Sequence, residues 1–564
     1  MLLPWIGRVL GVPLAGAAML HKRGFDKDAL RAKEINEETL IAILRHNRDT
    51  DFGRRHGFAE LRTVADFRRA LPVATYDYFR DDVARIARGE QNVLTADQVT
   101  HLGVTSGTTG EGKMIPMTAE SRKLVATAMI LLVQGFLAEN VPAARLGGRG
   151  MLLMSAVLPK RTEGGLPAGP STSVGMAGML RTSHMLWTSP PEVYQVPRQA
   201  DAMVLHLLFG LLDPSLRYIS APFASGVLDL FHTLERQWPR IVDGIGRGSI
   251  DADLDISPNL RTRLAARLRP RPAIAKKLEG EFARGMDGIA RRIFPRIGWI
   301  NTVCGGSFAV YADKFARFAG DLPVYSAVYG STEAMLGVGV GLGRPAYVMT
   351  PRTAFFEFVP EESMDASSPE TRLLGELAEG KRYEIVVTTR AGLYRYRMGD
   401  VVEVVGHRGG IPIVEFLYRR GGLLNLVGEK TSEDAAYSAL AGTLFREGLQ
   451  LRDYTVHGDI DAAPQRYVFF VELAPGHRVR DPDALSAPLD TALSGANPFY
   501  EMMRRPEKLG KTVFRQVEEG TFQLLKDVQI KRGASPSQAK VPRAVRDREL
   551  LELLRSRVLH RGDL

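Results

Sequence analysis

Apolar residues recur along the first third of the chain at intervals of three and four, the spacing of one helix face. This pattern predicts helices over 26–48 and 77–89, and a longer, more apolar helix over 119–138. Farther along, short apolar runs that end at glycine predict buried strands over 298–304 and 323–329. Because helices alternate with strands, the pattern favours an α/β core with antiparallel additions.

The second half of the chain predicts more strands and then shorter elements. Strands are expected over 383–389 and 400–405, after a polar surface loop at 361–370. The elements expected beyond them are a helix over 433–447, a strand over 466–473, and helices over 483–494 and 547–556. This change in element length predicts two domains, a large one over 1–427 and a small α+β domain over 428–564.

Composition narrows the class of protein. The 564 residues are 45% hydrophobic and 24% charged, as expected for a soluble globular protein. A net charge of +10 permits contact with nucleic acid or a membrane surface, but no basic run of nucleic-acid type is present. The lone Cys304 excludes an intramolecular disulfide and a cysteine zinc cluster, which favours a reducing, cytoplasmic location. The eleven histidines show no HExxH motif.

The N-terminus, MLLPWIGRVLGVPLAGAAML, is apolar over about the length of a signal peptide. Arg8 interrupts it, and no positive region precedes it, so a signal peptide is disfavoured. The stretch is also short and broken for a membrane span. We expect a first helix packed on the protein. Weak contact of residues 1–25 with a membrane surface is the alternative, since the basic HKR follows.

The stretch TSGTTGEGK lies at 105–113, ahead of the apolar helix. Its three glycines and its hydroxyl side chains disfavour helix and strand, and predict a loop rich in hydrogen-bond donors. Successive backbone N–H groups in such a loop form a nest for an anion, and Lys113 adds a positive charge. It is not a Walker A loop, because Met114 stands where that motif requires Ser or Thr. An ordinary surface turn is the alternative.

Two further loops place polar side chains beside predicted strands. The stretch YGSTE at 329–333 offers an aromatic ring to a base, hydroxyls to a phosphate, and the Glu333 carboxylate to Mg²⁺. The stretch YRYRMGD at 394–400 places Asp400 where a carboxylate can accept hydrogen bonds from a ribose diol. Taken alone, a strand-to-helix turn and a solvated strand face explain these two stretches equally well.

The three loops, in this order, resemble the adenylate-forming superfamily of acyl-CoA synthetases, nonribosomal peptide adenylation domains and luciferases. Within it the sequence is most similar to the Gretchen Hagen 3 (GH3) acyl-acid amido synthetases. Four stretches carry the closer resemblance: ALPVATYDYFRDDVARIARGE at 70–90, TEGGLPAGPSTS at 162–173, FLYRRGGLLNLVGEKTSE at 416–433 and RGASPSQAKVPRAV at 532–545. The resemblance spans nearly the whole chain, and the last stretch matches a GAS-x-x-Q-x-K-x-PR motif that the wider superfamily lacks.

The resemblance implies a large adenylate-forming domain with mixed sheets and a small mobile C-terminal domain. It implies that ATP binds to Ser106, Gly107, Thr108, Thr109, Gly110, Tyr329, Gly330, Ser331, Thr332, Asp400, Arg419 and Lys430. The implied catalytic residues are Lys113, Glu333 and Lys540, the last entering the site during adenylation, with Mg²⁺ at Glu333 and Thr109. The implied acyl pocket includes Cys304, Gly305, Gly306 and Ser307. The helical stripe of Val125, Ala128, Met129 and Leu132 is a further candidate, with core packing as its alternative.

The implied reaction adenylates a carboxylic acid and passes its acyl group to an amine, expected to be an amino acid. The cofactors are then ATP and Mg²⁺, and the partners are small molecules rather than nucleic acid, with a monomer expected. Two alternatives remain open at this point. One is an acyl-CoA or aryl-CoA ligase of the same superfamily. The other is a non-catalytic nucleotide-binding or membrane-surface regulatory protein, motivated by the apolar N-terminus and the positive charge.

Overall fold

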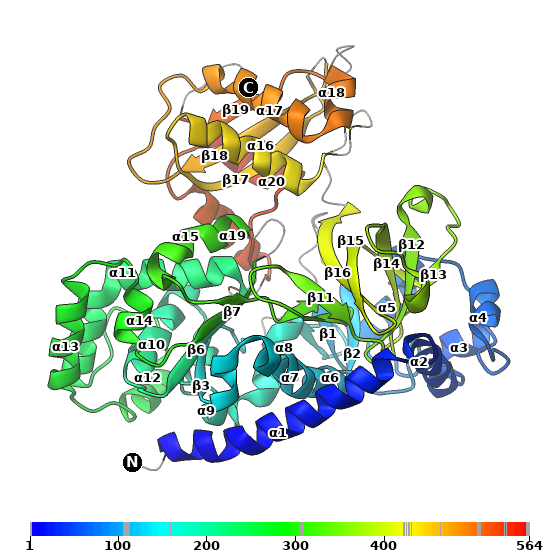
Figure 1. Ribbon diagram of the computed structural model, residues 1–564, viewed down its shortest axis with the longest axis horizontal. Coiled ribbons are helices and arrows are strands. Elements are labelled where there is room, and N and C mark those ends of the chain that lie inside the picture. The colour runs from blue at the N-terminus through cyan, green and yellow to red at the C-terminus, as the bar shows by residue number, and fades with distance from the viewer. Residues whose placement is uncertain are drawn as a thin grey trace.

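The computed structural model describes residues 3–104, 113–157, 160–304, 309–420, 424, 426, 429, 431–462, 464–504, 509–534, 536 and 539–559. These residues form a large α/β body that carries three sheets, with a smaller α+β body of C-terminal residues above it (Figure 1). This mixed α/β architecture with a C-terminal body is the fold class that the sequence predicts.

A parallel sheet forms one half of the large body. Its strands, in spatial order, are β3 (Arg149–Leu152), β6 (Leu216–Phe223), β7 (Trp299–Val303) and β8 (Val324–Tyr325). The helices that bury it in a common core are α10 (Gln199–Leu211), α11 (Ala224–Arg247), α12 (Pro258–Ala265), α13 (Pro272–Phe282), α14 (Ile289–Ile293) and α15 (Ala309–Ala319). Two short helices, α8 (Ser171–Met179) and α9 (Ser183–Leu186), lie beside β3 and a small separate cluster. Helices over a sheet of parallel strands are the arrangement that crossover connections require.

An antiparallel sheet of eight strands forms the other half. In spatial order its strands are β13 (Arg372–Leu373), β12 (Phe355–Pro360), β14 (Arg382–Thr388), β15 (Tyr396–Arg408), β16 (Ile411–Arg419), β11 (Ala346–Met349), β10 (Met335–Gly339) and β9 (Val328–Gly330). The register of β15 against β16 shifts at two irregularities, which bend the pair of long strands. The N-terminal helices α2 (Ala32–Asn47), α3 (Asp51–Arg55), α4 (Val64–Ala70) and α5 (Arg80–Ala87) contribute to the core of this sheet.

A third sheet shares its core with the eight-stranded sheet, and two of its strands flank the predicted phosphate loop in sequence. Its strands are β2 (Met114–Thr118), β1 (Val99–Val104), β5 (Pro167–Gly169) and β4 (Lys160–Arg161). Strands β1 and β2 pair antiparallel, with Val104 opposite Met114. Residues 105–112 connect them and lie outside the described residues, so the fold places Lys113 at the entrance of β2 beside the end of β1.

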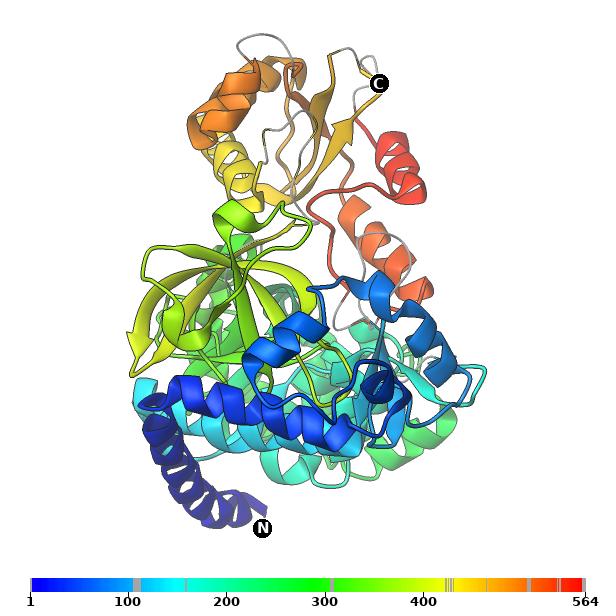
Figure 2. The ribbon, with the colours of Figure 1, turned by 90° about the vertical axis from the view of Figure 1, so that its right-hand side faces the viewer.

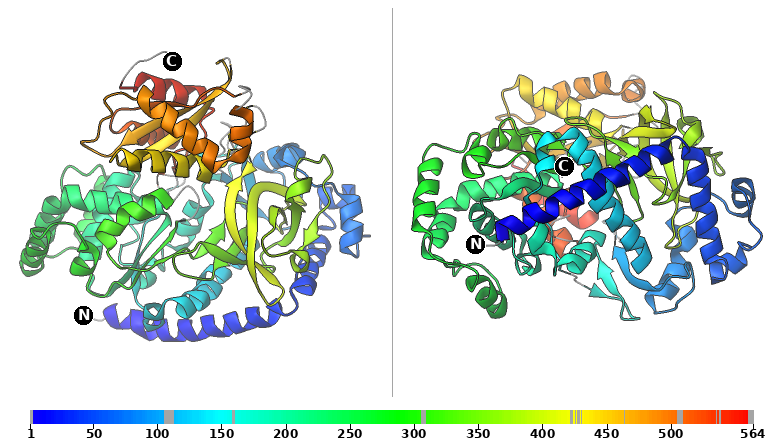
Figure 3. Two further views of the ribbon diagram at one scale, coloured as in Figure 1. Left: turned by 45° about the horizontal axis from the view of Figure 1, so that its top comes forward. Right: turned by 60° about the horizontal axis from the view of Figure 1, so that its bottom comes forward.

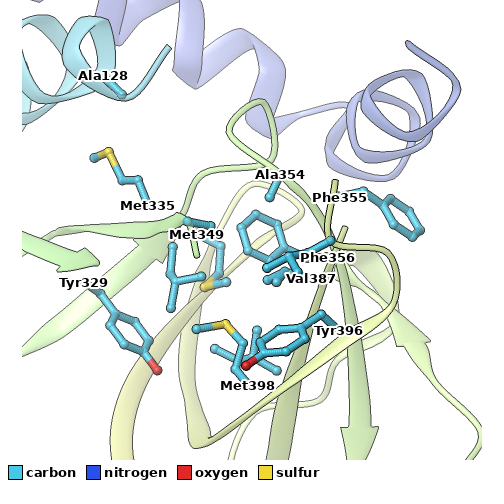
Figure 4. Packing of buried hydrophobic residues seen from close by; sticks show 14 of the residues in the cluster. Ala128, Tyr329, Met335, Met349, Ala354, Phe355, Phe356, Val387, Tyr396 and Met398 are labelled. Carbon is cyan, nitrogen blue, oxygen red and sulfur yellow. The ribbon is translucent and has the colours of Figure 1, made fainter. Parts of the chain in front are cut away.

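The predicted apolar helix extends over 119–140 and has a π-helical turn inside it. Segments α6 (Ala119–Thr127) and α7 (Val133–Asn140) flank this turn at Ala128–Leu132. By length and hydropathy alone, this helix is long and apolar enough to cross a membrane. However, several of its residues, such as Leu132 and Phe136, are buried in the same core as the eight-stranded sheet, so we assign it as a core helix. Figure 4 shows part of this core, with Ala128 on the helix side and Phe355 and Phe356 near the sheet.

The first helix, α1 (Leu3–Ala29), runs along the underside of the large body and packs against the 119–140 helix (Figure 3). Ala18, Phe25 and Ala29 are buried, whereas Met19 and Leu20 are exposed. The chain then turns at Leu30 and Arg31 into α2. The single helix predicted over 26–48 is therefore wrong: two helices meet there, because the change of direction lets both pack on the core.

The C-terminal body consists of a three-stranded sheet with helices on it. The sheet has the order β17 (Leu451–Asp459), β18 (Arg466–Leu473) and β19 (Val513–Gln516). Its helices are α16 (Glu433–Arg446), α17 (Ser486–Ala496), α18 (Pro498–Arg504), α19 (Thr521–Lys531) and α20 (Arg548–Ser556). Figure 2 shows this body above the large one, with α19 extending down beside the large body.

Polar contacts join the two bodies. Lys314 of α15 donates a hydrogen bond from Nζ to the backbone oxygen of Arg452 in β17. Lys526 of α19 lies 3.7 Å from Asp229 of α11, measured from Nζ to Oδ2. Burial lowers the pKa of Lys314 to about 8, with Asp453 acting against the shift. Apolar packing accompanies these polar contacts, because Tyr437 and Leu451 of the C-terminal body pack against the core of the parallel sheet.

Most predicted strands are confirmed, but the one over 323–329 is split. Its first part, β8, belongs to the parallel sheet, and its second part, β9, belongs to the eight-stranded sheet. A continuous apolar run does not reveal that a strand changes sheets in its middle, because both parts are buried. The change matters, since it carries Tyr329 to the edge of the antiparallel sheet.

Candidate active site

Asp400 forms the centre of one group of candidate residues. It lies in β15, directly opposite Arg419 in the last position of β16. Arg419 donates from Nε to Oδ1 at 2.5 Å, and Tyr329 donates from its hydroxyl to Oδ2 at 2.9 Å. Asp400 is only 4% exposed, so two donors compensate the burial of its charge. The charge of Asp400 raises the pKa of Arg419 far above its usual value, which keeps the guanidinium charged.

Two aromatic rings pack against the ring of Tyr329. The ring centroids of Tyr347 and Phe416 lie 5.4 and 6.0 Å away. Burial, together with the charge of Asp400, raises the pKa of Tyr329 well above its usual value. The phenol therefore stays neutral and donates its proton to the carboxylate, so Tyr329 orients Asp400 in addition to presenting an aromatic ring.

Tyr396 links two predicted catalytic residues that come from separate sheets. Lys113 Nζ donates to the Tyr396 hydroxyl at 3.4 Å, and this hydroxyl donates to Glu333 Oε1 at 3.4 Å. Burial and then the Glu333 charge raise the pKa of Tyr396 far above its usual value. Figure 4 shows Tyr396 and Tyr329 with their hydroxyl ends at the same edge of the core. The hydroxyl of Tyr396 thus aligns a cation and a carboxylate at that edge.

Neighbouring residues fix the backbone beside Lys113 and beside Tyr396. The Tyr76 hydroxyl accepts from the backbone N–H of Met114 and donates to the Met114 carbonyl, which anchors the residue after Lys113. Arg395, next to Tyr396, has a φ of +47° and is buried in a paired contact with Glu357. A positive φ is costly for arginine, so the buried ion pair offsets backbone strain beside the site.

The YGSTE stretch forms a hairpin turn between β9 and β10, not the strand-to-helix turn considered as an alternative from the sequence. Ser331 donates from its hydroxyl to the Ala334 carbonyl at 3.2 Å and accepts from the Ala334 N–H, so it closes the turn. Thr332 packs against Gly103 of β1: a Cβ built at Gly103 would lie 2.6 Å from Thr332 Cγ2. Gly330 in this stretch is exposed.

Lys540 approaches the same region from the C-terminal body. Its Nζ lies 5.6 Å from the centre of the Phe223 ring, at the end of β6 in the large body. The Lys540 side chain is exposed to solvent. Even so, the protein atoms packed around it lower the pKa of the ammonium, the charge of Arg419 lowers it further, and Asp400 and Glu433 oppose the shift. Lys540 is therefore within electrostatic reach of the Asp400–Arg419 pair.

The candidate acyl-pocket residues divide into two groups. Ala128 and Leu132 are buried core residues, as the alternative interpretation of the helical stripe predicts. Val125 is partly buried, and Met129 is 42% exposed. Cys304 follows β7, is partly buried against the core of the parallel sheet, and has its pKa raised by burial. Val125, Met129 and Cys304 remain predicted pocket residues.

Part of the predicted site lies outside the described residues. This part comprises Ser106, Gly107, Thr108, Thr109 and Gly110 of the phosphate loop, Gly305, Gly306 and Ser307 of the acyl pocket, and Lys430 of the hinge. Their assignments remain sequence predictions. Among the described predicted residues, hydrogen bonds join Asp400 to Tyr329 and Arg419. Tyr396 joins Lys113 to Glu333. Lys540 contacts Phe223.

Sequence reasoning missed several residues that support these contacts. They come from four separate parts of the chain and are Tyr76, Gly103, Phe223 and Tyr396. Tyr76 and Tyr396 do lie inside the 70–90 and 394–400 stretches quoted for other reasons. Buried tyrosines beside a predicted ligand loop were the available signal.

The fold and the site together define the class of the protein, an enzyme of the adenylate-forming fold. The solved structure of 2-hydroxyisobutyryl-CoA ligase in its postadenylation state superposes with a TM-score of 0.54, covering 94% of this chain and 92% of that one. At 12% identity this likeness concerns the fold alone.

Sequence comparisons give the family. Residues 21–324, 347–419 and 434–549 match the GH3 family N-terminal, central and C-terminal domains, and the chain belongs to the GH3 family. It is 32% identical to jasmonoyl–L-amino acid synthetase JAR4 of Nicotiana attenuata, over 94% of both chains. It is 31% identical to the probable indole-3-acetic acid-amido synthetase GH3.1 of Oryza sativa subsp. japonica, over 93% of this chain and 90% of that one. The solved GH3.15 acyl acid amido synthetase superposes with a TM-score of 0.85 at 27% identity, over 95% and 96% of the two chains.

Proposed function

We propose that the protein is an ATP-dependent acyl-acid amido synthetase. It converts a carboxylic acid to an acyl-adenylate and then passes the acyl group to an amine, which in this proposal is an amino acid. The observation that carries the proposal is the convergence of Asp400 with Arg419 and of Lys113 with Glu333, while Lys540 approaches from the C-terminal body. These groups suit a ribose diol and a chain of phosphates, and the GH3 match extends along the chain.

The first half-reaction is a substitution at phosphorus. A carboxylate oxygen of the acid attacks the α-phosphorus of ATP, the bond to the bridging oxygen breaks, and pyrophosphate leaves with that electron pair. No general base is needed, because the carboxylate is already ionised near neutral pH. The difficulty is that anions meet, so cations placed where negative charge develops are the expected catalysts. Lys113 and Lys540 supply such charges, and Asp400 orients the ribose.

Among the described residues, the site offers Mg²⁺ few protein ligands. The described residues contain no group of three or more His, Cys, Asp or Glu side chains that could enclose a metal. Glu333 supplies one hard oxygen ligand near Lys113, which suits an ion held mainly by substrate phosphates. When bound, Mg²⁺ would neutralise phosphate charge and polarise the phosphorus. Thr109 is proposed as a second ligand from the sequence alone.

The second half-reaction forms the amide bond. The amine nitrogen attacks the acyl carbon of the adenylate, the bond from that carbon to the phosphate oxygen breaks, and AMP leaves while the nitrogen loses a proton. We propose that the acid is apolar, with an aryl, indolyl or fatty group beside Val125, Met129 and Cys304. The relatives described above carry the names of a jasmonoyl–L-amino acid synthetase and a probable indole-3-acetic acid-amido synthetase, and the second name specifies an indolyl acid.

A pyrophosphate assay tests the proposal. Aryl, indolyl and fatty acids are each offered with ATP and Mg²⁺, and the best acid is then tested with twenty amino acids for amide product by mass spectrometry. Replacing Lys540 by Ala should reduce pyrophosphate exchange about a hundredfold, because one charge aimed at the transition state is lost. Lys531→Ala, an exposed lysine at the end of α19, is the matched control. Failure of every acid to release pyrophosphate would refute adenylation.

The same assay separates the CoA-ligase alternative. An amido synthetase forms an amide with an amino acid and gives no thioester when CoA is offered. A CoA ligase does the reverse, although both release pyrophosphate. The non-catalytic alternative predicts no pyrophosphate with any acid.

We also propose weak contact of residues 1–25 with an anionic membrane surface. Met19 and Leu20 are 49% and 65% exposed on α1, with the exposed, basic Arg23 next to them. The GH3 match begins at residue 21, so most of this apolar stretch lies before it. Sedimentation with anionic vesicles should carry the full chain down more than its Met19→Ser, Leu20→Ser variant. Equal sedimentation of the two proteins would contradict membrane contact through these residues. The protein is further proposed to be a cytoplasmic monomer that binds no nucleic acid.

A further inference from the structure

The segment that follows Lys540 is attached to the free edge of the C-terminal sheet. Val456 of β17 donates from its N–H to the Arg543 carbonyl at 2.9 Å, and Val545 donates back to the Val456 carbonyl at 2.8 Å. Ala544 forms a parallel bridge with Val456. Thr455 adds a hydrogen bond from its hydroxyl to the Pro542 carbonyl. Lys540 is therefore presented to the site by a segment bound edge-on to β17.

One side chain of this segment is directed into the C-terminal body. Arg543 is 7% exposed, and its Nη1 donates to Asp453 Oδ1 at 2.5 Å and to the Tyr454 carbonyl. Its guanidinium carbon lies 4.7 Å from the centre of the Tyr454 ring. Burial favours the neutral form of Asp453, but the charge and hydrogen bond of Arg543 together with the charges of Lys526 and Lys314 outweigh it and lower the pKa of Asp453. The result is a buried ion pair stacked on an aromatic ring.

Backbone hydrogen bonds alone do not explain this ion pair. The bonds to β17 already attach the segment, whereas burying an arginine and an aspartate carries a desolvation cost that tight packing of apolar side chains would avoid. What the pair adds is orientation, because a planar guanidinium held by a carboxylate, a carbonyl and a ring has one position. This anchor stands three residues after Lys540, whose ammonium lies beside Phe223 of the large body.

We propose that Arg543 is a positioning residue for adenylation: through Asp453 and Tyr454 it fixes the segment that delivers Lys540 to the reacting phosphate. The inference rests on the proposed function, because it requires that Lys540 acts in the first half-reaction. Arg543 touches neither substrate in this scheme and acts through Lys540. When the ion pair of Arg543 is loosened, the Lys540 ammonium is no longer held in one position. A displacement of about 1 Å at a reacting centre can lower the rate about a hundredfold.

The test compares the two half-reactions. Arg543→Lys retains the charge but cannot bridge Asp453, the Tyr454 carbonyl and the ring at once. We expect it to lower kcat for pyrophosphate exchange at least about tenfold, while the rate of amide formation from supplied acyl-adenylate changes less than about twofold. An equal loss in both half-reactions, or no loss in either, would overturn the proposal.

Two further variants guard against a folding defect. Arg543→Met combined with Asp453→Leu removes both members of the ion pair together, and it should show the same selective loss. Arg504→Lys is the matched control, since Arg504 pairs with Asp490 in the same body through three hydrogen bonds. It should lower the melting temperature without changing the ratio of the two half-reactions. A change in that ratio would assign the effect to general loosening of the body.

The Lys540→Ala background gives the decisive measurement. If Arg543 acts only through Lys540, Arg543→Lys should cause no further loss of the residual exchange in that background. An additional loss of tenfold there would overturn the proposal. A wild-type protein that releases no pyrophosphate with any acid would refute the proposed function instead, so the two failures are distinguishable.

Discussion

Arg419 lies directly across the sheet from Asp400, and its Nε donates to Asp400 Oδ1 at 2.5 Å. The side chain of Arg419 is 46% exposed, whereas that of Asp400 is 5% exposed. One member of the pair is therefore buried, and the other is partly exposed to solvent. An ionised carboxylate has about four lone-pair positions, so bonds from Arg419 and Tyr329 leave capacity for a ribose diol.

Replacing Asp400 by Asn should raise the Michaelis constant for ATP by about ten- to a hundredfold. The expected loss is that of hydrogen bonds to a charged group, about 1.5–3 kcal/mol. Asn retains the shape of the side chain, so the sheet should remain intact. Steady-state kinetics with varied ATP measure the change. Glu403→Gln, on the same strand, is the control and should leave the constant unaltered. A normal constant for Asp400→Asn would show that ribose binds elsewhere.

Tyr396→Phe should lower kcat for adenylation about tenfold and leave the fold intact. Phenylalanine preserves the packing of this fully buried ring but removes the hydroxyl between Lys113 and Glu333. The lysine and the carboxylate are then free to pair directly, which draws Lys113 away from the phosphates. Single-turnover measurement of acyl-adenylate formation isolates this step.

Tyr394→Phe provides the control for that experiment. Tyr394 is equally buried, but its hydroxyl donates to the Leu94 carbonyl, away from Lys113 and Glu333. It should lose about 1 kcal/mol of stability with no loss of adenylation rate. If both phenylalanine variants adenylate at the wild-type rate, the hydroxyl of Tyr396 has no part in aligning the two catalytic groups.

Local pattern predicted most elements of the fold. The strand over 466–473 and the helix over 433–447 agree with β18 and α16, because periodicity and flanking polar residues mark elements that lie wholly within one layer. The split of 323–329 between two sheets and the turn at Leu30 depend on distant partners. Such tertiary features leave no trace in a local pattern.

The candidate site shows the same division. Motif resemblance identified Asp400, Arg419 and Lys113, whose proposed roles are in ligand binding and which stand in recognisable stretches. It did not identify Tyr396 as a bridge or Gly103 as a space for Thr332, because these roles depend on atoms supplied by other strands. The proposed role of Arg543 likewise depends on Asp453, ninety residues earlier in the chain.

Gly103→Ala should impair ATP use by displacing Thr332. A Cβ at position 103 would lie 2.6 Å from Thr332 Cγ2 and 3.0 Å from Met117 Sδ, closer than packed atoms allow. The methionine end can move, but Thr332 is held in a tight hairpin turn beside Glu333. We expect the ratio kcat/KM for ATP to fall about tenfold, since the turn must shift.

A second substitution tests that cause. Thr332→Ser removes Cγ2 and retains the hydroxyl, so it should restore most of the activity of Gly103→Ala. Gly341→Ala is the control, because a Cβ there meets no atom within 4 Å. A Gly103→Ala protein that Thr332→Ser does not rescue would place the defect in β1 itself.

Acid should destabilise the protein through buried histidines, and His101 in β1 is the clearest case. It is 1% exposed, and burial followed by the charge of Arg122 lowers its pKa to about 4. In the unfolded chain the pKa is about 6.5. Between these values the unfolded state binds a proton that the folded state does not. Stability is therefore full above pH 6.5 and falls as the pH drops toward 4, by at most about 3 kcal/mol.

His101→Leu should flatten this part of the pH profile, measured as the free energy of unfolding in urea at pH 7, 6 and 5. The flattening is partial, because burial also lowers the pKa of His206 to about 3 and this second histidine remains. The loss of the ring removes one hydrogen bond, between Nδ1 and the Thr100 hydroxyl, whereas Nε2 of His101 has no hydrogen-bond partner among the described residues. The exposed His184, replaced by Leu, is the control and should leave the slope unchanged. An identical slope for His101→Leu and wild type would mean that His101 is protonated, or exposed, in the folded protein.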